Sequence, residues 1–256
     1  MATAIRFTGV GKRYMVAHQR PFLAKELLRM VLQRPSQRNE FWALRDVSFT
    51  IEQGESVAIL GTNGSGKSTT LALVAQTTRP TEGTVEVNGR LGPLLELGAG
   101  FHPDLTGYEN VYLNASLLGL SRREVDGLLG RIIDYSGIGD FIDAPIQTYS
   151  TGMKARLGFA VIAHIDPDVL LLDEVLSVGD GQFAHKCEAT IRGFKKAGKT
   201  LCFVSHSPSQ VLALCERAIW LHQGRVQRIG AASSVCEAYQ RFLDSGVVEA
   251  PAEASA

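Results

Sequence analysis

The chain has 256 residues, 45% of them hydrophobic, and carries 26 basic and 26 acidic side chains. This length and composition predict one α/β domain with a smaller helical lobe, and they exclude a small disulfide-stabilised domain. Because the formal net charge is zero, there is no overall basic field of the kind that nucleic-acid-binding proteins use. We therefore expect no nucleic acid among the partners.

Neither a signal peptide nor a membrane-spanning segment is expected. The first residues lack a basic region followed by an apolar core, and no run of about 18 apolar residues occurs. The cysteines are scattered without zinc-site spacing, in segments that predict helix or strand interior: Cys187, Cys202, Cys215 and Cys236. This pattern is typical of buried, reduced thiols in a cytosolic protein.

The first predicted strand covers residues 5–10 and is followed by a basic segment, residues 15–40. After Pro21, apolar residues recur in this segment at roughly helical spacing, as in an amphipathic helix. Two interpretations are open. The helix lies at the membrane boundary or against a membrane partner, or it is a solvated helix packed on the β-rich part of the domain.

Four further predicted strands follow in the first half of the chain, at residues 41–51, 57–60, 84–87 and 91–97. We expect several of them to be antiparallel, beside the strand at 57–60. From Thr106 the pattern becomes helical. Helices are predicted over 108–118 and, from a capping box at Ser121 and Glu124, to about residue 135.

A strand, a glycine-rich loop and a helix follow one another from Val57, and the loop has the spacing G-x-x-x-x-G-K-S. Glycines allow successive N–H groups to turn toward phosphate oxygens, and the helix N-terminus favours negative charge. Lys67 supplies a charge to the β and γ phosphates, and the Ser68 hydroxyl is a ligand for Mg²⁺. A glycine-rich surface turn is the alternative. The predicted ATP-binding residues here are Gly61, Thr62, Asn63, Gly64, Ser65, Gly66, Lys67, Ser68 and Thr69.

Two later motifs carry polar groups at places where ligands bind. Ser150, Thr151 and Gly152 begin another helix, whose free N–H groups form a second anion site, although the sequence does not say which phosphate binds there. A buried strand at 169–172 ends in Asp173 and Glu174, where open α/β sheets bind ligands.

The two acids have different predicted roles. Asp173 would hold Mg²⁺ or its water shell, and Glu174 would orient and deprotonate the attacking water. His206 ends the next apolar strand, over 200–205, from which it could reach a γ phosphate. A single histidine at a strand end is more often structural, but its position after the acidic strand fits a phosphate sensor.

In order and spacing these motifs resemble those of the ATP-binding cassette (ABC) transporter ATPases, from about Ile5 to Leu243. Residues 177–180 resemble the D-loop of that family. The resemblance implies a P-loop NTPase over residues 1–245, with a RecA-like core, an antiparallel β subdomain and a helical subdomain at about 104–160. Residues 246–256 are expected to be a disordered tail. The resemblance to the ABC family also implies a head-to-tail homodimer in which residues 150–152 of one copy close over ATP held by Lys67 of the other.

Residues 94–110, 112–120 and 149–153 look like those of the polysaccharide exporters, and among these the ATPase subunits that export lipid-linked O-antigen. Capsule and teichoic acid exporters are the related alternatives. The resemblance implies a separate integral-membrane permease, a lipid-linked polysaccharide as transported substrate, and a peripheral position at the cytoplasmic face of the inner membrane. A soluble ABC ATPase is the rival interpretation, but such proteins usually carry a coiled-coil insert or two cassettes.

The sequence departs from the family pattern at three places. The usual Q-loop glutamine is replaced by Leu97, next to Glu96, so Glu96 is a candidate for Mg²⁺ or for coupling to the permease. Thr151 and Met153 stand where the superfamily usually has glycine and glutamine. The carbohydrate-binding extension of some O-antigen ATPases is not expected. For stacking on adenine, Tyr14 is the first candidate and Trp42 is the competitor, with packing as the other role expected for Trp42.

Overall fold

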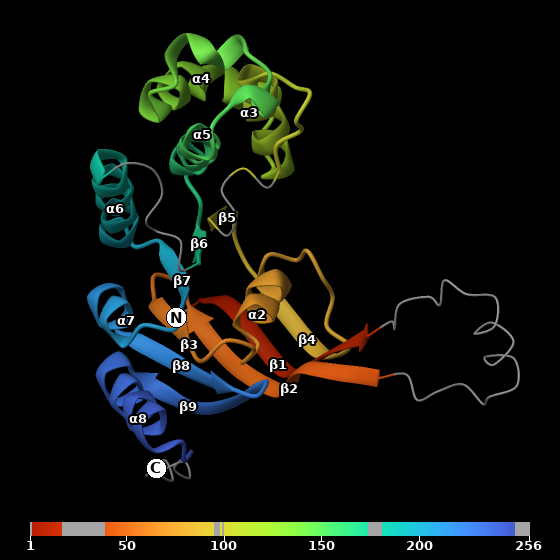
Figure 1. Ribbon diagram of the computed structural model, residues 1–256, viewed down its shortest axis with the longest axis vertical. Helices are drawn as coiled ribbons and strands as arrows, with labels where there is room; N and C mark the ends of the chain where they lie inside the picture. Colours follow the sequence, from red (N-terminus) through yellow and green to blue (C-terminus); the bar gives the residue numbers. More distant parts are fainter. Residues whose placement is uncertain (1, 17–38, 95–97, 99, 174–180, 249–256) are drawn as a thin grey trace, which may run out of the picture.

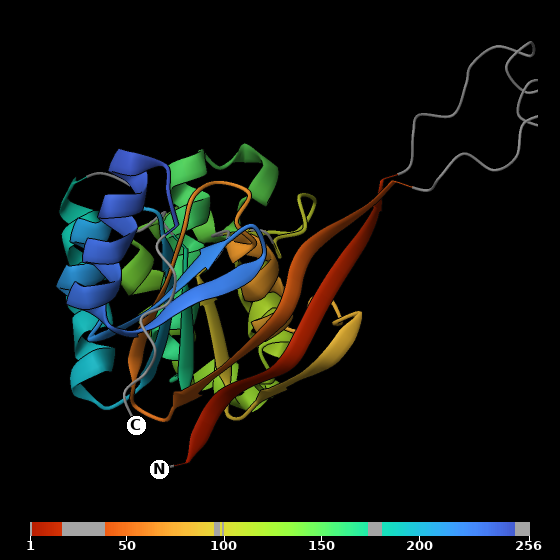
Figure 2. The same ribbon diagram turned by 90° about the horizontal axis from the view of Figure 1, so that it is seen from below.

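The computed structural model describes residues 2–16, 39–94, 98, 100–173 and 181–248 (Figure 1). Three strands form an antiparallel sheet in the order β2-β1-β4, with β1 at Thr3–Val16, β2 at Asn39–Glu52 and β4 at Glu82–Val87. The paired ends of β1 and β2 reach away from the body of the molecule (Figure 2).

The main sheet has six strands in the order β5-β6-β7-β3-β8-β9. All neighbours are parallel except β8 and β9, which are antiparallel. Their bounds are Leu91–Leu94 for β5, Val169–Leu172 for β6, Thr200–Ser205 for β7, Ser56–Leu60 for β3, Arg217–His222 for β8 and Arg225–Ala231 for β9.

Strand β3 is buried along its whole length, because both faces of the main sheet are covered. Ala58 and Leu60 face the core formed with helices α5, α6, α7 and α8, whereas Val57 and Ile59 face the core formed with α2 and the three-stranded sheet. Figure 2 shows α6, α7 and α8 gathered on one side. These helices are α2 at Lys67–Val74, α5 at Thr151–His164, α6 at Gly181–Lys196, α7 at Pro208–Leu214 and α8 at Ala232–Ser245.

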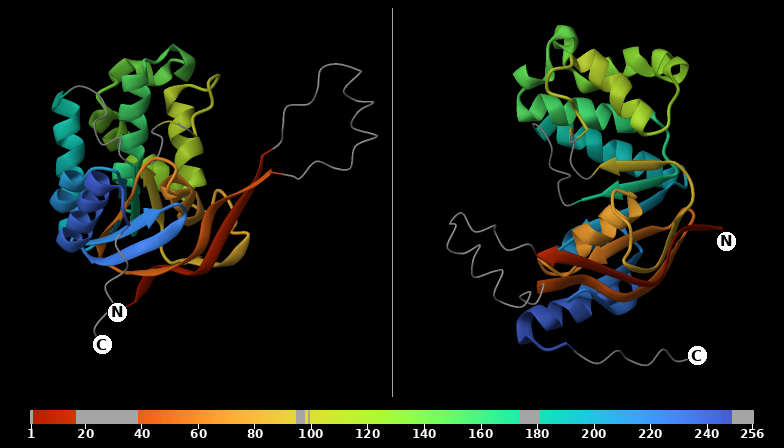
Figure 3. Two further views of the ribbon diagram at one scale, coloured as in Figure 1. Left: turned by 60° about the horizontal axis from the view of Figure 1, so that its bottom comes forward. Right: turned by 90° about the vertical axis from the view of Figure 1, so that its right-hand side faces the viewer.

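A helical lobe lies at the opposite end of the molecule from α8 (Figure 3). It contains α3 at Gly107–Leu117, α4 at Arg122–Ser136 and two short 3₁₀ helices, η1 at Gly139–Asp143 and η2 at Ile146–Thr148. Helix α5 connects this lobe to the main sheet, since α5 packs on α3 and α4 and also lines the sheet core. The lobe has its own apolar core, centred on residues such as Val111, Ile132 and Leu157.

The predicted helix starts are confirmed. Thr106 and Ser121 cap α3 and α4, and each forms a capping box with the glutamate three residues later, Glu109 and Glu124. Ser150 caps α5, where its hydroxyl accepts a hydrogen bond from Met153 N at 3.2 Å. The predicted strands at 41–51, 57–60, 84–87 and 200–205 are also present.

The expectation of several antiparallel strands in the first half is confirmed for β1, β2 and β4. The strand that begins at Leu91 is not one of them, since β5 belongs to the main sheet and runs parallel to β6. The cause is a tertiary pairing: Arg90 N donates to Asp168 Oδ2 at 2.8 Å, and Asp168 N donates to Arg90 O at 2.9 Å. These bonds align the start of β5 with β6, so the turn at Asn88 and Gly89 does not close a hairpin.

Strand β1 is longer than predicted, because it extends to Val16, paired with Asn39 of β2. The helix predicted after Pro21 and the tail beyond residue 248 lie outside the described residues. Within the described ranges, no helix combines the length and the apolar character that crossing a bilayer requires. All four cysteines are buried and free.

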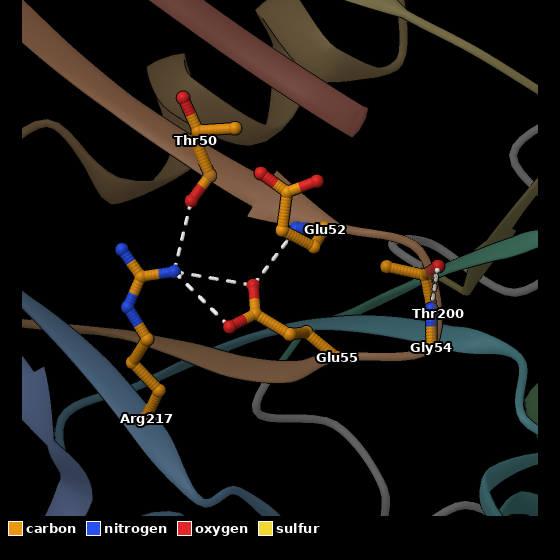
Figure 4. A network of polar contacts seen from close by, with 6 residues as sticks. All are labelled: Thr50, Glu52, Gly54, Glu55, Thr200 and Arg217. Carbon is orange, nitrogen blue, oxygen red and sulfur yellow. Dashed lines mark hydrogen bonds and ion pairs between the residues drawn. The ribbon is translucent and has the colours of Figure 1, made fainter. Parts of the chain in front are cut away.

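A polar network fixes the start of β3 (Figure 4). Arg217 Nη1 donates to Thr50 O at 2.9 Å and to both carboxylate oxygens of Glu55, at 3.1 and 3.3 Å. Glu55 Oε2 also accepts from Glu52 N, at 2.8 Å. Since the network joins β2, β3 and β8, it sets the position from which β3 delivers the glycine loop.

Candidate functional site

The glycine loop after β3 is shaped by close packing against β8. A Cβ on Gly61 would lie 2.3 Å from Leu221 O and 2.5 Å from Ser65 Oγ, so only glycine fits there. Ser65 itself is 2% exposed, and its hydroxyl lacks a hydrogen-bond partner in the structure. Gly224 N donates to Ser65 O at 3.0 Å. The loop is therefore held from behind by the turn between β8 and β9.

The loop ends at Gly66, which has φ of 109° and forms the N-cap of α2. A side chain there would be strained and would also meet Leu44 Cδ2 at 2.6 Å. No side chain caps α2, and the first N–H groups of an α-helix have no acceptor within the helix itself. This arrangement is a cradle for a phosphate group, formed by backbone N–H groups and a helix N-terminus.

Lys67 places its positive charge at this cradle. The side chain is only 7% exposed, and Nζ donates to Gly61 O at 2.8 Å and to Thr62 O at 3.1 Å. The ammonium group therefore lies across the glycine loop, within the strand-loop-helix turn. From there it can neutralise negative charge on a phosphate that the loop binds.

Strand register brings the glycine loop, Asp173 and His206 to one edge of the main sheet. Strand β7 lies between β3 and β6, and all three are parallel. Ser205 is paired with Leu60, so His206 follows β7 at the level where the glycine loop follows β3. On the other side of β7, Leu172 of β6 is paired with Phe203. Asp173 therefore lies two residues before the level of His206 along the strands. The carboxyl ends of parallel strands are where open α/β sheets bind ligands.

Ser68 and Asp173 line the same cavity, of about 540 Å³, between the main sheet and the helical lobe. A hydroxyl and a carboxylate are oxygen ligands, the type that Mg²⁺ prefers, and Mg²⁺ usually keeps several waters. The two residues therefore fit a magnesium site. In the described part of the chain, no cluster of three or more histidine, cysteine or acidic side chains could bind a metal by itself.

Sequence reasoning missed the helical wall of this cavity. The wall includes Asn114 of α3, the C-cap residue Leu118 that follows α3, and Gly158 and Ile162 of α5. Asn114 and Leu118 lie in the segment 112–120 that resembles the polysaccharide exporters, but neither that resemblance nor the helical pattern predicts a cavity wall.

Several predicted site residues lie outside the described residues. They are Glu174, Glu96 and the D-loop-like segment 177–180. Their roles stay predictions.

The structure does not bring residues 150–152 to the cradle of the same chain. Ser150 and Thr151 are exposed and do not line the cavity, whereas Ile162 of the same helix does. At a rise of about 1.5 Å per residue, Ser150 lies roughly 18 Å from Ile162 along α5. The cap of α5 is therefore free to face another molecule.

The aromatic candidates lie on the arm formed by β1 and β2. Tyr14 is 40% exposed, and Lys12 Nζ lies 5.0 Å from its ring centroid. Trp42 is half-buried and packs against Gly11, with the guanidinium carbons of Arg13 and Arg45 each 5.5 Å from its ring centroid. Trp42 also lines a hollow of about 440 Å³ that reaches Gly64 of the glycine loop. Trp42 therefore has packing contacts, as expected, and the assignment of adenine to Tyr14 or to Trp42 remains a prediction.

Comparisons with known proteins agree with this geometry. A family model described as ABC transporter matches residues 44–177. The chain is 49% identical over 246 residues to the O-antigen export system ATP-binding protein RfbB of Klebsiella pneumoniae, covering 95% of this chain and 100% of that protein. It is 43% identical over 239 residues to the teichoic acids export ATP-binding protein TagH of Listeria innocua, covering 93% of this chain and 70% of that protein.

The fold has a solved counterpart. An ATP-binding cassette solved as a dimer in a post-hydrolysis state, bound to ADP and Pi, has a TM-score of 0.68 and 23% identity, covering 89% of this chain and 98% of that one. From the family match, the sequence relatives and the cradle at the carboxyl edge of the main sheet, we conclude that this chain belongs to the ABC transporter family, as an ATP-hydrolysing cassette.

Proposed function

We propose that this chain is the ATPase subunit of an exporter that moves a lipid-linked polysaccharide, O-antigen in the first place, across the cytoplasmic membrane. One observation carries the ATPase part of the proposal. The glycine-loop cradle, Asp173 and the end of β7 meet at one edge of three adjacent parallel strands. A phosphate-binding loop, a metal-binding acid and a polar group beside them are what phosphoryl transfer to water requires.

Each group has a proposed role. The N–H groups at Gly66 and in the first turn of α2 bind phosphate oxygens, and Lys67 neutralises charge on the β and γ phosphates. Ser68 and Asp173 hold Mg²⁺, which, when bound, offsets charge that develops during phosphoryl transfer. His206 contacts the γ phosphate from the neighbouring strand, and Glu174 takes the proton from the attacking water.

A second copy of the chain completes the proposed site. Because the cap of α5 is exposed and lies apart from the cradle of its own chain, it is available to the nucleotide of a partner copy. Ser150, Thr151 and Gly152 would then add a helix N-terminus to the phosphates on the opposite side. The solved counterpart, which is a dimer, supports this arrangement.

The transported substrate is proposed from the relatives. The matched proteins named for O-antigen export show 44 to 49% identity, and those named for teichoic acid export show 41 to 44%. Lipid-linked O-antigen is therefore the first proposal, with teichoic acid or capsular polysaccharide as the alternatives. The permease is a separate membrane protein, and this chain binds it from the cytoplasmic face of the membrane.

The assignment of the base is tested with Glu174→Gln. This isosteric change removes the proton acceptor and keeps the shape of the site. We expect unchanged ATP binding and a loss of turnover of at least about 100-fold, the lower end of what a general base contributes. Normal turnover would remove Glu174 from the role of base.

The exporter proposal is tested in the source cell with Lys67→Ala. We expect less polysaccharide at the surface and accumulation of its lipid-linked form inside, whose chemistry then identifies the substrate. If surface polysaccharide is unchanged while the variant protein is present and no other exporter replaces it, the exporter proposal is wrong.

A further inference from the structure

The segment that leads into the Ser150 cap is bound to the loop that precedes α3. Thr106 and Pro145 also form an isolated antiparallel bridge. Three backbone hydrogen bonds join residues 103–107 to residues 144–147: Gly107 N to Ala144 O at 3.1 Å, Ile146 N to Leu105 O at 2.9 Å, and Gln147 N to Pro103 O at 3.1 Å. The two segments therefore form one unit, although they lie about 40 positions apart in the sequence.

Tyr149, the residue directly before the cap, closes this unit. Its side chain is 5% exposed, and its hydroxyl donates a hydrogen bond to Phe141 O of η1. The hydroxyl lies directly against Gly107, the first residue of α3: a Cβ there would be 2.2 Å from Tyr149 Oη. The tyrosine thus contacts both sides of the unit at the base of the cap.

The other end of the unit reaches the cavity. Asn110 is fully buried, and its amide nitrogen donates to the carbonyl oxygens of His102, Leu105 and Thr106 at 2.9 to 3.1 Å. Its own backbone oxygen accepts from Asn114 Nδ2 at 3.2 Å, and Asn114 lines the cavity that Ser68 and Asp173 also line. A continuous set of hydrogen bonds therefore connects the cavity wall with the segment that carries Ser150.

We infer that Tyr149 is a positioning residue, whose hydroxyl bond to Phe141 O sets the place of the Ser150 cap relative to α3. The inference rests on the proposed function, in which that cap meets the nucleotide of a partner copy. Ring burial alone would hold a phenylalanine in the same pocket. The hydroxyl adds a directional bond, and burial together with the nearby Asp143 charge raises the pKa of Tyr149, so the hydroxyl stays protonated and donates.

The experiment uses the full chain with Glu174→Gln, so that ATP is bound and not consumed. Dimerisation with ATP is measured by sedimentation, and binding of a fluorescent ATP analogue is measured at protein concentrations below dimerisation. We expect Tyr149→Phe to weaken dimerisation about three- to tenfold, the effect of one hydrogen bond, and to leave binding by the single copy unchanged.

Tyr135→Phe is the matched control. Tyr135 is also partly buried, and its hydroxyl shares a 2.7 Å hydrogen bond with Thr190 Oγ1 of α6, away from the cap. The Tyr135→Phe variant loses a hydroxyl hydrogen bond comparable to that of Tyr149, so its ATP-dependent dimerisation should equal that of the Glu174→Gln parent. Thermal unfolding of both variants reports any general loss of stability.

A second variant approaches the same contact from the other side. Gly107→Ala puts a methyl group against the Tyr149 hydroxyl, so it should also weaken dimerisation. Without the hydroxyl, the nearest atoms to that methyl group are Ile142 O at 3.0 Å and Tyr149 Cζ at 3.1 Å. We therefore expect Gly107→Ala to have a smaller effect when combined with Tyr149→Phe than alone.

The outcomes separate the two proposals. If the Glu174→Gln parent dimerises with ATP and Tyr149→Phe dimerises equally well, the positioning role is wrong and the proposed function stands. If the parent itself forms no dimer with ATP, the shared site is wrong, and the positioning role falls with it. Additive effects of Gly107→Ala and Tyr149→Phe would also overturn the inference, because the two groups would then act separately.

Discussion

The carboxyl edge of the main sheet and the cap of α5 are both proposed anion sites, but they are built in different ways. At the sheet edge, three fully buried strands, β3, β6 and β7, deliver the groups by register, and apolar packing on both faces holds the strands. At the cap, Ser150 lies on an exposed turn of the helical lobe. Its place depends on polar contacts around α3, such as those of Asn110 and Tyr149.

This difference separates two tasks. Apolar strands give the cradle a fixed position, because moving one strand would disturb two cores at once. In the lobe, directional hydrogen bonds hold the cap in place. The lobe contacts the main sheet through α5, and a cavity separates other parts of the lobe from the sheet. A rigid half-site and a half-site on a separate lobe suit a nucleotide that two copies enclose and release.

The largest effect is expected from overpacking the rigid half. Gly61→Ala would put a methyl group 2.3 Å from Leu221 O, which must move β8 or the loop. We expect the free energy of unfolding to fall by about 3 kcal/mol, with loss of ATP binding. Urea unfolding and nucleotide titration measure both. The control is Gly64→Ala, where a methyl group meets nothing within 4 Å and only the positive φ of 78° adds strain, about 1 kcal/mol. Equal losses for both variants would contradict the packing account.

The helical lobe is tested by removing its buried amide. Asn110→Ala removes the side-chain donor to three carbonyl oxygens, which each keep a backbone donor, and it removes the acceptor of the His102 N–H. We expect a loss of about 2 kcal/mol in the free energy of unfolding, because these groups are partly buried. Hydrogen exchange should increase in residues 101–107 and 144–149 and stay unchanged in β3 and β7. Increased exchange in the strands would mean that the two regions are not held independently.

Alkaline pH should weaken the sheet core through its buried thiols, since all four cysteines lie outside the helical lobe. Burial raises the pKa of Cys202 from 9.0 to about 12. The stabilising effect of keeping this thiol neutral is complete below pH 9. It is lost as the pH rises from 9 toward 12, because the unfolded chain releases the proton first. The loss is about 1.4 kcal/mol for each pH unit in that range.

The comparison of the native chain with Cys202→Ala isolates this contribution. The variant should be less stable at pH 8, and its stability should fall less steeply between pH 9 and 11. Parallel curves for the two proteins would show that Cys202 does not titrate differently in the folded state.

The smallest effect is expected from a helix cap in the lobe. In the capping box of α4, Ser121 N and Oγ each donate to Glu124 Oε2 at 2.7 Å. Ser121→Ala removes the hydroxyl and should lower the free energy of unfolding by about 1 kcal/mol. Ser121→Thr, which keeps a hydroxyl, is the control and should recover most of it. No change in either variant would indicate that α4 depends on the lobe core alone.

The sequence predicted most of the sheet edge, because its signals are local. Alternating or continuous apolar runs gave β3, β6 and β7, and the polar residues that follow them in the sequence necessarily meet where parallel strands end. It did not predict the parallel pairing of β5, since that depends on the contact of Arg90 with Asp168, 78 positions away. Asn88 and Gly89 are typical turn residues, but a turn does not say which strand the next segment pairs with.

In the lobe, capping residues predicted where the helices begin, but not how the lobe is held together. No sequence pattern predicts the hydrogen bonds of Asn110 and Tyr149, because their partners are backbone oxygens that any residue could supply. Only the folded arrangement shows that Gly107 leaves the space for the Tyr149 hydroxyl. Polar contacts between side chains and distant backbone are thus the part that sequence patterns leave open.

The central claim, that one site is shared by two copies, is tested most directly by mixing two inactive variants, Lys67→Ala and Ser150→Arg. A mixed dimer has one site in which both defects meet and one site in which Lys67 and Ser150 are both intact. With random pairing, half of the dimers are mixed, so ATP hydrolysis should recover to about a quarter of the native rate. Activity that remains at the level of the separate variants, with mixed dimers present, would contradict the shared site.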